Sequence, residues 1–248
     1  MKIRANVSKV SKEGSPVKAY ADITLENCCT LYGIRVVEGR DGLFVSYPQK
    51  PEMENGKQKV HEDGKPAYTD VYFANSKEAN DAIKKLVLDA YNSEKGYAYI
   101  NPEEGKGVVA KIEPKLHSCN GEKTKAAGRL VIGGYMVVPD VFVNLRTDKD
   151  GGKFLAVSYP SYKSGDTYKG FVEPLAKGKI WDAKEKAEKE YNFLRAVEGA
   201  MKKQTLEFHP ELADQVKGKV DELIADATEA SKEGAAEAKP EPEKEPAL

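Results

Sequence analysis

The sequence predicts an α+β fold built from two copies of one small antiparallel sheet, each closed by a helix. The first observation is a set of short segments that recur in the same order, 112, 107 and 100 residues apart. They are Val45–Pro48 with Val157–Pro160, Lys18-Ala19 with Lys125-Ala126, and Tyr91-Asn92 with Tyr191-Asn192. The second observation is that strand-like alternation precedes helical apolar spacing in both copies. The drift in spacing indicates loops of different length between matching elements.

Strands are expected where apolar and polar residues alternate. Ala19, Ala21, Ile23 and Leu25 are separated by polar or aromatic residues, which is typical of a half-buried strand. Asp-Gly turns lie between β-rich runs, and Pro48 and Pro160 end strands because proline cannot donate to the ladder. The expected strands are Ile3–Val10, Ala19–Leu25, Thr30–Val37, Leu43–Tyr47 and Ala67–Phe73, then Val108–Leu116, Ala126–Ile132, Tyr135–Leu145, Phe154–Tyr159 and Thr167–Val172.

A helix is expected at the end of each copy. Ser76 suits an N-cap, and the apolar stripe after it has helical spacing: Ala79, Ile83, Leu86, Val87 and Ala90. The second helix is predicted over Ile180–Met201. A further amphipathic helix is predicted from Pro210 to about Ser231, carrying Leu212, Val216, Val220, Leu223 and Ile224.

These elements divide the chain into five segments. The first copy covers residues 1–96, a linker covers 97–107, and the divergent second copy covers 108–203. The extra amphipathic helix covers 204–230. Residues 231–248 are rich in Ala, Glu, Lys and Pro, a composition that buries too little apolar surface to offset the entropy of ordering, so a disordered acidic tail is predicted.

Composition indicates a soluble, cytoplasmic protein. Hydrophobic residues make up 40% of the 248 residues and charged residues 32%, with no run long enough to span a bilayer and no apolar region of a secretory signal. Residues 204–248 carry 12 acidic and 5 basic side chains, which leaves 34 basic against 28 acidic in residues 1–203. A mildly basic body with an acidic tail is compatible with a nucleic-acid partner.

Nothing in the sequence indicates an enzyme, a metal site or a cofactor. His61, His117 and His209 share no helical face with carboxylates at ligand spacing. No glycine-rich phosphate loop or nucleophile elbow is present. The three cysteines, of which Cys28 and Cys29 are adjacent, form no disulfide framework. A non-enzymatic protein without cofactors is therefore expected.

The first copy resembles the SpoVG (stage V sporulation protein G) family of septation regulators. The resemblance lies in Ala21–Leu25, Gly33–Gly39 and Asp41–Pro48, which are similar to the family patterns A-S-I-T-L-D, D-I-R-V-I-D-G and N-G-L-F-V-A-M-P. It covers residues 1 to about 95. The second copy is more distant, with Val138–Val143 and Phe154–Pro160 matching the strands on either side of the hairpin.

The resemblance implies a small non-enzymatic cytoplasmic protein with a twisted antiparallel sheet and a C-terminal helix. It implies a role in septum formation, sporulation and cell division in bacteria, and dimer formation. Some relatives regulate genes by binding DNA or RNA, through basic residues just after the M-P strand end. The corresponding residues here are Lys50 in the first copy, and Lys163 and Lys169 in the second; each loop keeps one lysine where the family has an adjacent basic pair.

Two functions follow as hypotheses. In the first, loops after Pro48 and Pro160 bind DNA or RNA weakly through Lys50, Lys163 and Lys169, with Tyr162 among the tyrosines that could stack on bases. In the alternative, the lysines are solvated and the tyrosines pack on the sheet. The protein is then an interaction scaffold that has lost nucleic-acid binding and contacts protein partners through its sheet edges or its last helix. No membrane partner is expected. In either case, edges that pair between two chains in a single-domain relative would pair between the copies, giving an intramolecular pseudo-dimer.

Overall fold

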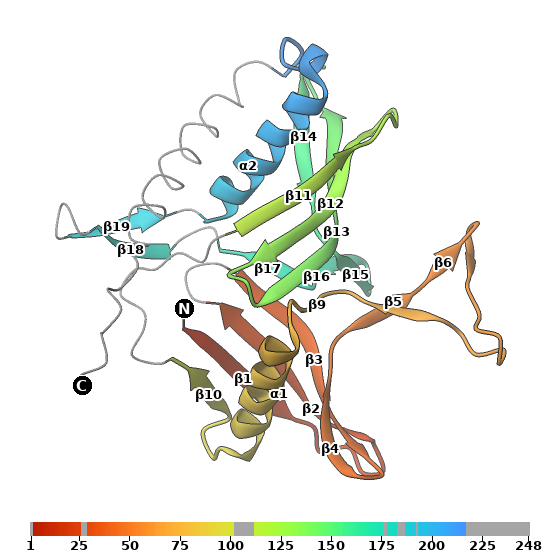
Figure 1. The fold of residues 1–248 in the computed structure, drawn as a ribbon, viewed down its shortest axis with the longest axis vertical. Coiled ribbons are helices and arrows are strands. Elements are labelled where there is room, and N and C mark those ends of the chain that lie inside the picture. The colour runs from red at the N-terminus through yellow and green to blue at the C-terminus, as the bar shows by residue number, and fades with distance from the viewer. Residues whose placement is uncertain are drawn as a thin grey trace, which may run out of the picture.

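Within the described residues, two large antiparallel sheets each pack against one helix, and four two-stranded sheets accompany them. Figure 1 shows how these elements are arranged. The computed structural model describes residues 2–25, 29–101, 112–175, 178–182, 187–191 and 193–216. The first sheet and helix α1 (Lys77–Asn92) lie in the lower part of Figure 1, and the second sheet and helix α2 (Phe193–Phe208) in the upper part. The predicted α+β class is confirmed.

The first sheet has the strand order β10-β1-β2-β3, and the outer side of β3 is shared by two short partners, β4 and β17. Its strands are β1 (Ile3–Lys9), β2 (Val17–Leu25), β3 (Cys29–Gly39), β4 (Gly42–Ser46), β10 (Tyr97–Ile100) and β17 (Val172–Pro174). The alternation that predicted β2 is realised, because Ala19, Ala21, Ile23 and Leu25 are all buried. The strand β10 forms the first part of the expected linker 97–107 and belongs to the sheet; residues 102–107 lie outside the described part of the chain.

Helix α1 covers the inner face of this sheet. Ser76 caps it by accepting a hydrogen bond from the Ala79 amide at 3.1 Å. Its buried residues are the predicted stripe, Ala79, Ile83, Leu86, Val87 and Ala90. Burial of this stripe against β1 and β10 holds the helix on the sheet.

The second sheet has the order β11-β12-β13-β14, and the short strand β9 also pairs with β13. Its strands are β9 (Phe73–Ala74), β11 (Ile112–Ser118), β12 (Thr124–Ile132), β13 (Met136–Thr147) and β14 (Lys153–Ser158). Helix α2 packs against β11, β13 and β14. The expected start of β11 at Val108 lies outside the described residues.

The central strands of the two sheets pair in matching register. Ala19 lies opposite Val36 in the first sheet, and Ala126 lies opposite Val143 in the second. Each pairing has two shifts of register, and the shifts lie at corresponding places. The first precedes the alanine in both sheets, and the second lies between Ala21 and Ile23 in one sheet and between Gly128 and Leu130 in the other. Strands β1–β4 and β11–β14 therefore share their order, and their central pairs share register and the positions of the irregularities.

Each half of the chain contributes a short strand to the other sheet. β17, from the second half, pairs with β3, placing Val172 opposite Leu31. β9, from the first half, pairs with β13, placing Phe73 opposite Val137. One cluster of buried side chains includes residues of both sheets, so the core is continuous between the halves.

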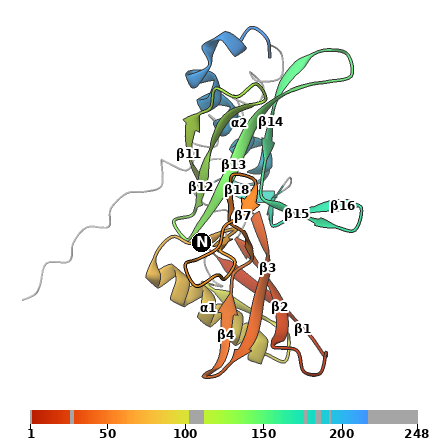
Figure 2. The same cartoon turned by 90° about the vertical axis from the view of Figure 1, so that its right-hand side faces the viewer.

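Two ribbons project from this body in different directions (Figures 1 and 2). The first consists of β5 (Gln49–Pro51) with β8 (Tyr68–Asp70) and, further out, β6 (Met53–Glu54) with β7 (Lys57–Gln58). The second is the hairpin of β15 (Ser161–Ser164) and β16 (Thr167–Gly170). The loops expected after Pro48 and Pro160 thus contain paired strands.

The helix expected over Ile180–Met201 is wrong in its first half. Residues Gly178–Asp182 (β18) and Ala187–Tyr191 (β19) pair as an antiparallel hairpin, and α2 begins only at Phe193. The helical spacing there rested on alanines, which specify burial weakly, whereas Ile180 and Trp181 are residue types that favour strands.

The C-terminal segment also differs from expectation. Helix α2 continues through the expected boundary at 203/204 to Phe208, and a 3-10 turn follows at Pro210–Leu212. Leu212 and Val216 are buried, as their place on an apolar stripe predicts. Residues 217–248, which contain the rest of the predicted last helix and the tail, lie outside the described residues. None of the helices in the described part has the length and apolar character needed to cross a membrane.

Candidate functional site

Three of the four predicted nucleic-acid contacts lie on one hairpin. Tyr162 and Lys163 are on β15 and Lys169 is on β16, where Tyr162 lies opposite Lys169 and Lys163 lies opposite Tyr168. All four side chains are exposed, and Tyr168 is 74% exposed. Neither lysine takes part in an ion pair within the described residues. The hairpin, which projects from the body in Figure 2, therefore carries two exposed lysines and two exposed tyrosines.

Local sequence explains the hairpin. Gly165 adopts φ +62° in the turn, a conformation that costs glycine little, and the Thr167 hydroxyl donates to the Ser164 carbonyl at 3.1 Å. At the base, the Tyr162 ring packs on Phe171 with centroids 4.7 Å apart. Tyr162 thus anchors the hairpin with one part of its ring while the remainder stays exposed.

Lys50 is placed elsewhere. It lies on β5 in the other ribbon, and its ammonium forms an ion pair with Asp140 Oδ2 at 2.5 Å. Asp140 belongs to β13 in the second sheet, so this pair joins the two halves. The structure does not bring Lys50 into the group formed by Lys163, Lys169 and Tyr162.

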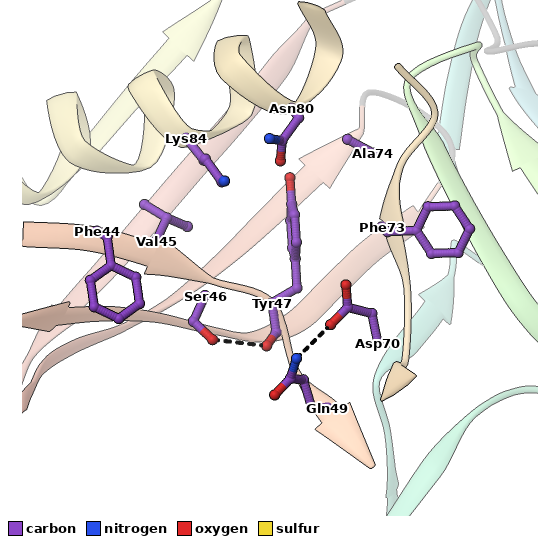
Figure 3. A pocket seen from close by; sticks show the side chains of 10 residues that line it. All are labelled: Phe44, Val45, Ser46, Tyr47, Gln49, Asp70, Phe73, Ala74, Asn80 and Lys84. Atoms are coloured by element: carbon purple, nitrogen blue, oxygen red, sulfur yellow. Dashed lines mark hydrogen bonds between the residues drawn. The ribbon is translucent and has the colours of Figure 1, made fainter. Parts of the chain in front are cut away.

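A cleft beside β4 is a feature that sequence reasoning missed. It has a volume of about 370 Å³ and lies between β4, the start of the first ribbon and α1 (Figure 3). The lining residues are Phe44, Val45, Ser46, Tyr47, Gln49, Asp70, Phe73, Ala74, Asn80 and Lys84. They come from three separate stretches of the chain, so no local pattern indicates them; the only hint is the recurrence of Tyr47 in the Val-Ser-Tyr-Pro repeat.

Tyr47 is the most buried polar group of the cleft. Its side chain is largely enclosed, with the residue 8% exposed, and its hydroxyl has no hydrogen-bond partner within the described residues. Burial, reinforced by the charge of Asp70, raises the pKa of Tyr47 to about 12, so the hydroxyl keeps its proton at neutral pH. Asp70 itself accepts a hydrogen bond from the Gln49 amide at 3.0 Å.

The histidines and cysteines of the described residues form no constellation of metal ligands. No group of three or more His, Cys, Asp or Glu residues there could hold a metal ion. His209 is buried, and its Nε2 lies 2.9 Å from the Lys125 carbonyl and 3.1 Å from the Ser118 hydroxyl. This histidine fastens the 3-10 turn to the second sheet. Cys29 and Cys119 form no disulfide, and Cys28 lies outside the described residues.

Comparison with known proteins gives a family for the first half. The SpoVG family model matches residues 1–93, which comprise β1 to β9 and α1. A protein of Archaeoglobus fulgidus named "Putative septation protein SpoVG" is 37% identical over 84 residues, covering 34% of this chain and 86% of that protein. The protein of the same name in Treponema denticola is 33% identical over 85 residues, covering 34% of this chain and 78% of its own length.

A third relative is consistent with these two. The protein of the same name in Bdellovibrio bacteriovorus is 35% identical over 78 residues, covering 32% of this chain and 62% of its own length. No solved structure matches the chain. The matched residues contain strands β1 to β4 of the first sheet and helix α1. On the strength of these relatives the chain belongs to the SpoVG family.

Proposed function

We propose that this protein is a non-enzymatic SpoVG-like regulator in septation, sporulation or gene expression, and that it contacts DNA or RNA through the hairpin β15–β16. Family membership and the septation names of the relatives support the regulatory role. The observation that carries the nucleic-acid contact is the gathering of Lys163, Lys169, Tyr162 and Tyr168 on one exposed hairpin.

The chemistry of that hairpin suits a single strand better than a duplex. Exposed rings offer stacking surfaces to unpaired bases, and such stacking tolerates any base sequence. The lysine ammonium groups neutralise phosphates and release counterions. Two lysines provide a weak, salt-sensitive attachment, because log affinity falls by roughly 0.7 to 0.9 units per phosphate neutralised for each unit of log salt.

Fluorescence anisotropy with the full chain and labelled random single-stranded DNA and RNA tests this proposal. Binding is expected in the micromolar range at low salt. The slope of log affinity against log salt should be about −1.4 on these single-stranded probes if both lysines contact phosphates, at roughly −0.7 per phosphate. The double variant K163E/K169E should abolish it. The matched control is K12E/K149E, which makes the same charge change at two exposed turn positions. Equal loss in both variants would point to a general charge effect and against the hairpin.

The second candidate is a protein-interaction scaffold without nucleic-acid binding. The observation that favours it is Lys50, whose charge is used in the ion pair with Asp140. The acidic residues after position 204 also repel nucleic acid. If wild type binds neither DNA nor RNA at low salt, the scaffold becomes the leading function.

We further infer that the two halves arose by tandem duplication and form an intramolecular pseudo-dimer. The matching registers of β2–β3 and β12–β13 support a common origin. The reciprocal placement of β9 and β17 supports the pseudo-dimer, since each half completes the other's sheet. Sedimentation equilibrium should give a monomer of 27.3 kDa. A stable dimer at micromolar concentration would contradict the idea that the chain supplies its own partner domain.

A further inference from the structure

We propose that the cleft between β4 and α1 binds an extended acidic peptide segment of a partner protein, with a glutamate or aspartate side chain inserted beside Tyr47. The proposal concerns a surface in the first half of the chain and is independent of the nucleic-acid hairpin. It rests on three hydrogen-bond donors without partners and on the open edge of β4.

The three donors converge on the upper part of the cleft. Figure 3 shows the Tyr47 hydroxyl pointing toward α1, with the Asn80 amide above it and the Lys84 ammonium directed into the same space. The amide oxygen of Asn80 lies on the side of Tyr47, and its nitrogen lies on the side of Lys84. Within the part of the chain that the structure describes, none of these three side-chain groups has a hydrogen-bond or ion-pair partner. The Tyr47 hydroxyl has almost no accessible surface in the free protein, so an acceptor reaches it only after the side chains above it shift. A buried hydroxyl without a partner costs free energy, which such an acceptor would recover.

A carboxylate is the acceptor that fits these donors. It offers two oxygens and a full negative charge, and it can accept from an ammonium, an amide and a hydroxyl at once. The one acid that lines the cleft, Asp70, lies in its lower part and accepts from Gln49 there. Lys84 is thus the cation with an unmatched charge in this cleft, and a ligand acid would match it.

The form of the ligand follows from the strand next to the cleft. β4 pairs with β3 on one side, and no described strand pairs with its other edge. An exposed edge offers a row of amide and carbonyl groups to an incoming extended chain. Phe44 on β4 is 49% exposed at the rim and offers an apolar contact to the neighbouring side chains of such a chain. A peptide added along β4 would carry every second side chain toward α1.

Titration of the full-length protein with a labelled capped peptide tests the proposal. The probe alternates valine and threonine around a central glutamate, and the comparison peptides carry glutamine or lysine at the centre. Saturable binding of the glutamate peptide is expected, with binding of the glutamine peptide about tenfold weaker. Equal binding of all three peptides, tighter binding of the lysine peptide, or no binding of any would overturn the proposal.

Two pairs of variants separate recognition from folding. K84Q should weaken binding about tenfold or more, whereas K85Q, which removes the charge of a lysine paired with Asp89 on the same helix, should leave it unchanged. Y47F should weaken binding several-fold without lowering the stability of the free protein, since it removes a hydroxyl that has no partner. The control Y159F makes the same change at a half-buried tyrosine whose buried hydroxyl also lacks a partner but which does not line this cleft. Equal effects within either pair would contradict the assigned site.

Amide hydrogen exchange locates the peptide. Slower exchange of the Gly42–Ser46 amides on addition of the glutamate peptide is expected if the peptide extends the first sheet. Protection confined to other strands, or peptide-induced dimerisation of the protein, would overturn the assignment to the β4 edge.

Discussion

Lys50 and Asp140 form an ion pair of 2.5 Å between the first ribbon and the second sheet, 90 residues apart in sequence. Asp140 has φ +56°, in the left-handed region, although it lies within a strand. Gly33, at the corresponding register position of β3, has φ +91°. The two sheets therefore share a positive φ at one register position. In the first sheet a glycine, Gly33, occupies this position. In the second sheet Asp140 occupies it, and its side chain reaches Lys50 of the first half.

A double-mutant cycle should show what the Lys50–Asp140 pair contributes. D140N keeps a residue type that tolerates positive φ and removes the charge, and K50Q removes the partner charge. Both side chains are partly exposed, so a coupling free energy of about 0.2 to 1 kcal/mol is expected from urea unfolding. The coupling should shrink as salt is raised. A coupling indistinguishable from zero at low salt would mean that the ion pair does not help to hold the halves together.

Gly33 should tolerate alanine poorly. A Cβ at this position would lie 3.2 Å from the Phe171 ring and 3.3 Å from Pro48 Cβ, and the positive φ adds backbone strain. G33A should lower the free energy of unfolding by about 1 to 3 kcal/mol. G14A is the matched control, because Gly14 has φ +73° with no atom within 4 Å of the added Cβ. If the two variants lose equal stability, the close approach of Phe171 and Pro48 to Gly33 adds nothing to the cost of the alanine, and only the backbone strain remains.

Leu31 should be among the costly positions of the core. It is fully buried in β3 opposite Val172 from the other half. L31A should lower the free energy of unfolding by about 2 to 5 kcal/mol, through lost burial and a residual cavity. L43A, on the edge strand β4 where Leu43 is 39% exposed, should cost much less. Chemical denaturation of both variants measures the difference. Equal losses of unfolding free energy would mean that Leu31 is not part of the core.

Elements with strong local periodicity could be predicted from the sequence. The stripe of α1 and its Ser76 cap needed only helical spacing and a capping residue, and both are observed. The alternation in β2 likewise identified its buried face. The hairpin β18–β19 was missed because its few apolar residues satisfy helical spacing without specifying a helix. Local signals fail where alanine and charged residues dominate.

Contacts between the halves had no local signal. β9 has two residues and β17 has three, too short for a period to appear, and their partners lie far away in sequence. The grouping of Lys163, Lys169 and Tyr162 follows from their nearness around one turn. Tertiary packing brings Lys50 to Asp140, and it gathers Tyr47, Asn80 and Lys84 around one cleft. No pattern within a single segment of the sequence indicates either contact.

The contact between Tyr32 and Glu173 should be visible in a pH titration. The Tyr32 hydroxyl donates to Glu173 Oε2 at 2.8 Å across the two halves. The pKa of Tyr32 is raised to about 12, mainly by burial and secondly by the hydrogen bond to Glu173 and its charge. A tyrosine in the unfolded chain has a pKa of about 10, so between pH 10 and 12 the folded state keeps a proton that the unfolded state has lost. This contribution to stability is complete below pH 10 and is lost as pH rises through 12.

E173Q tests the assignment of this shift. Removing the negative charge should lower the pKa of Tyr32, measured by phenolate absorbance with Y32F subtracted, but leave it above 10 because burial remains. Tyr47 is the internal control, since its raised pKa comes from burial and Asp70, and its titration should not move. The decline in stability between pH 10 and 12 should become shallower in E173Q, because the difference in bound protons between the folded and unfolded states decreases. An unchanged Tyr32 titration would mean that β17 does not hold Glu173 against the first sheet in solution.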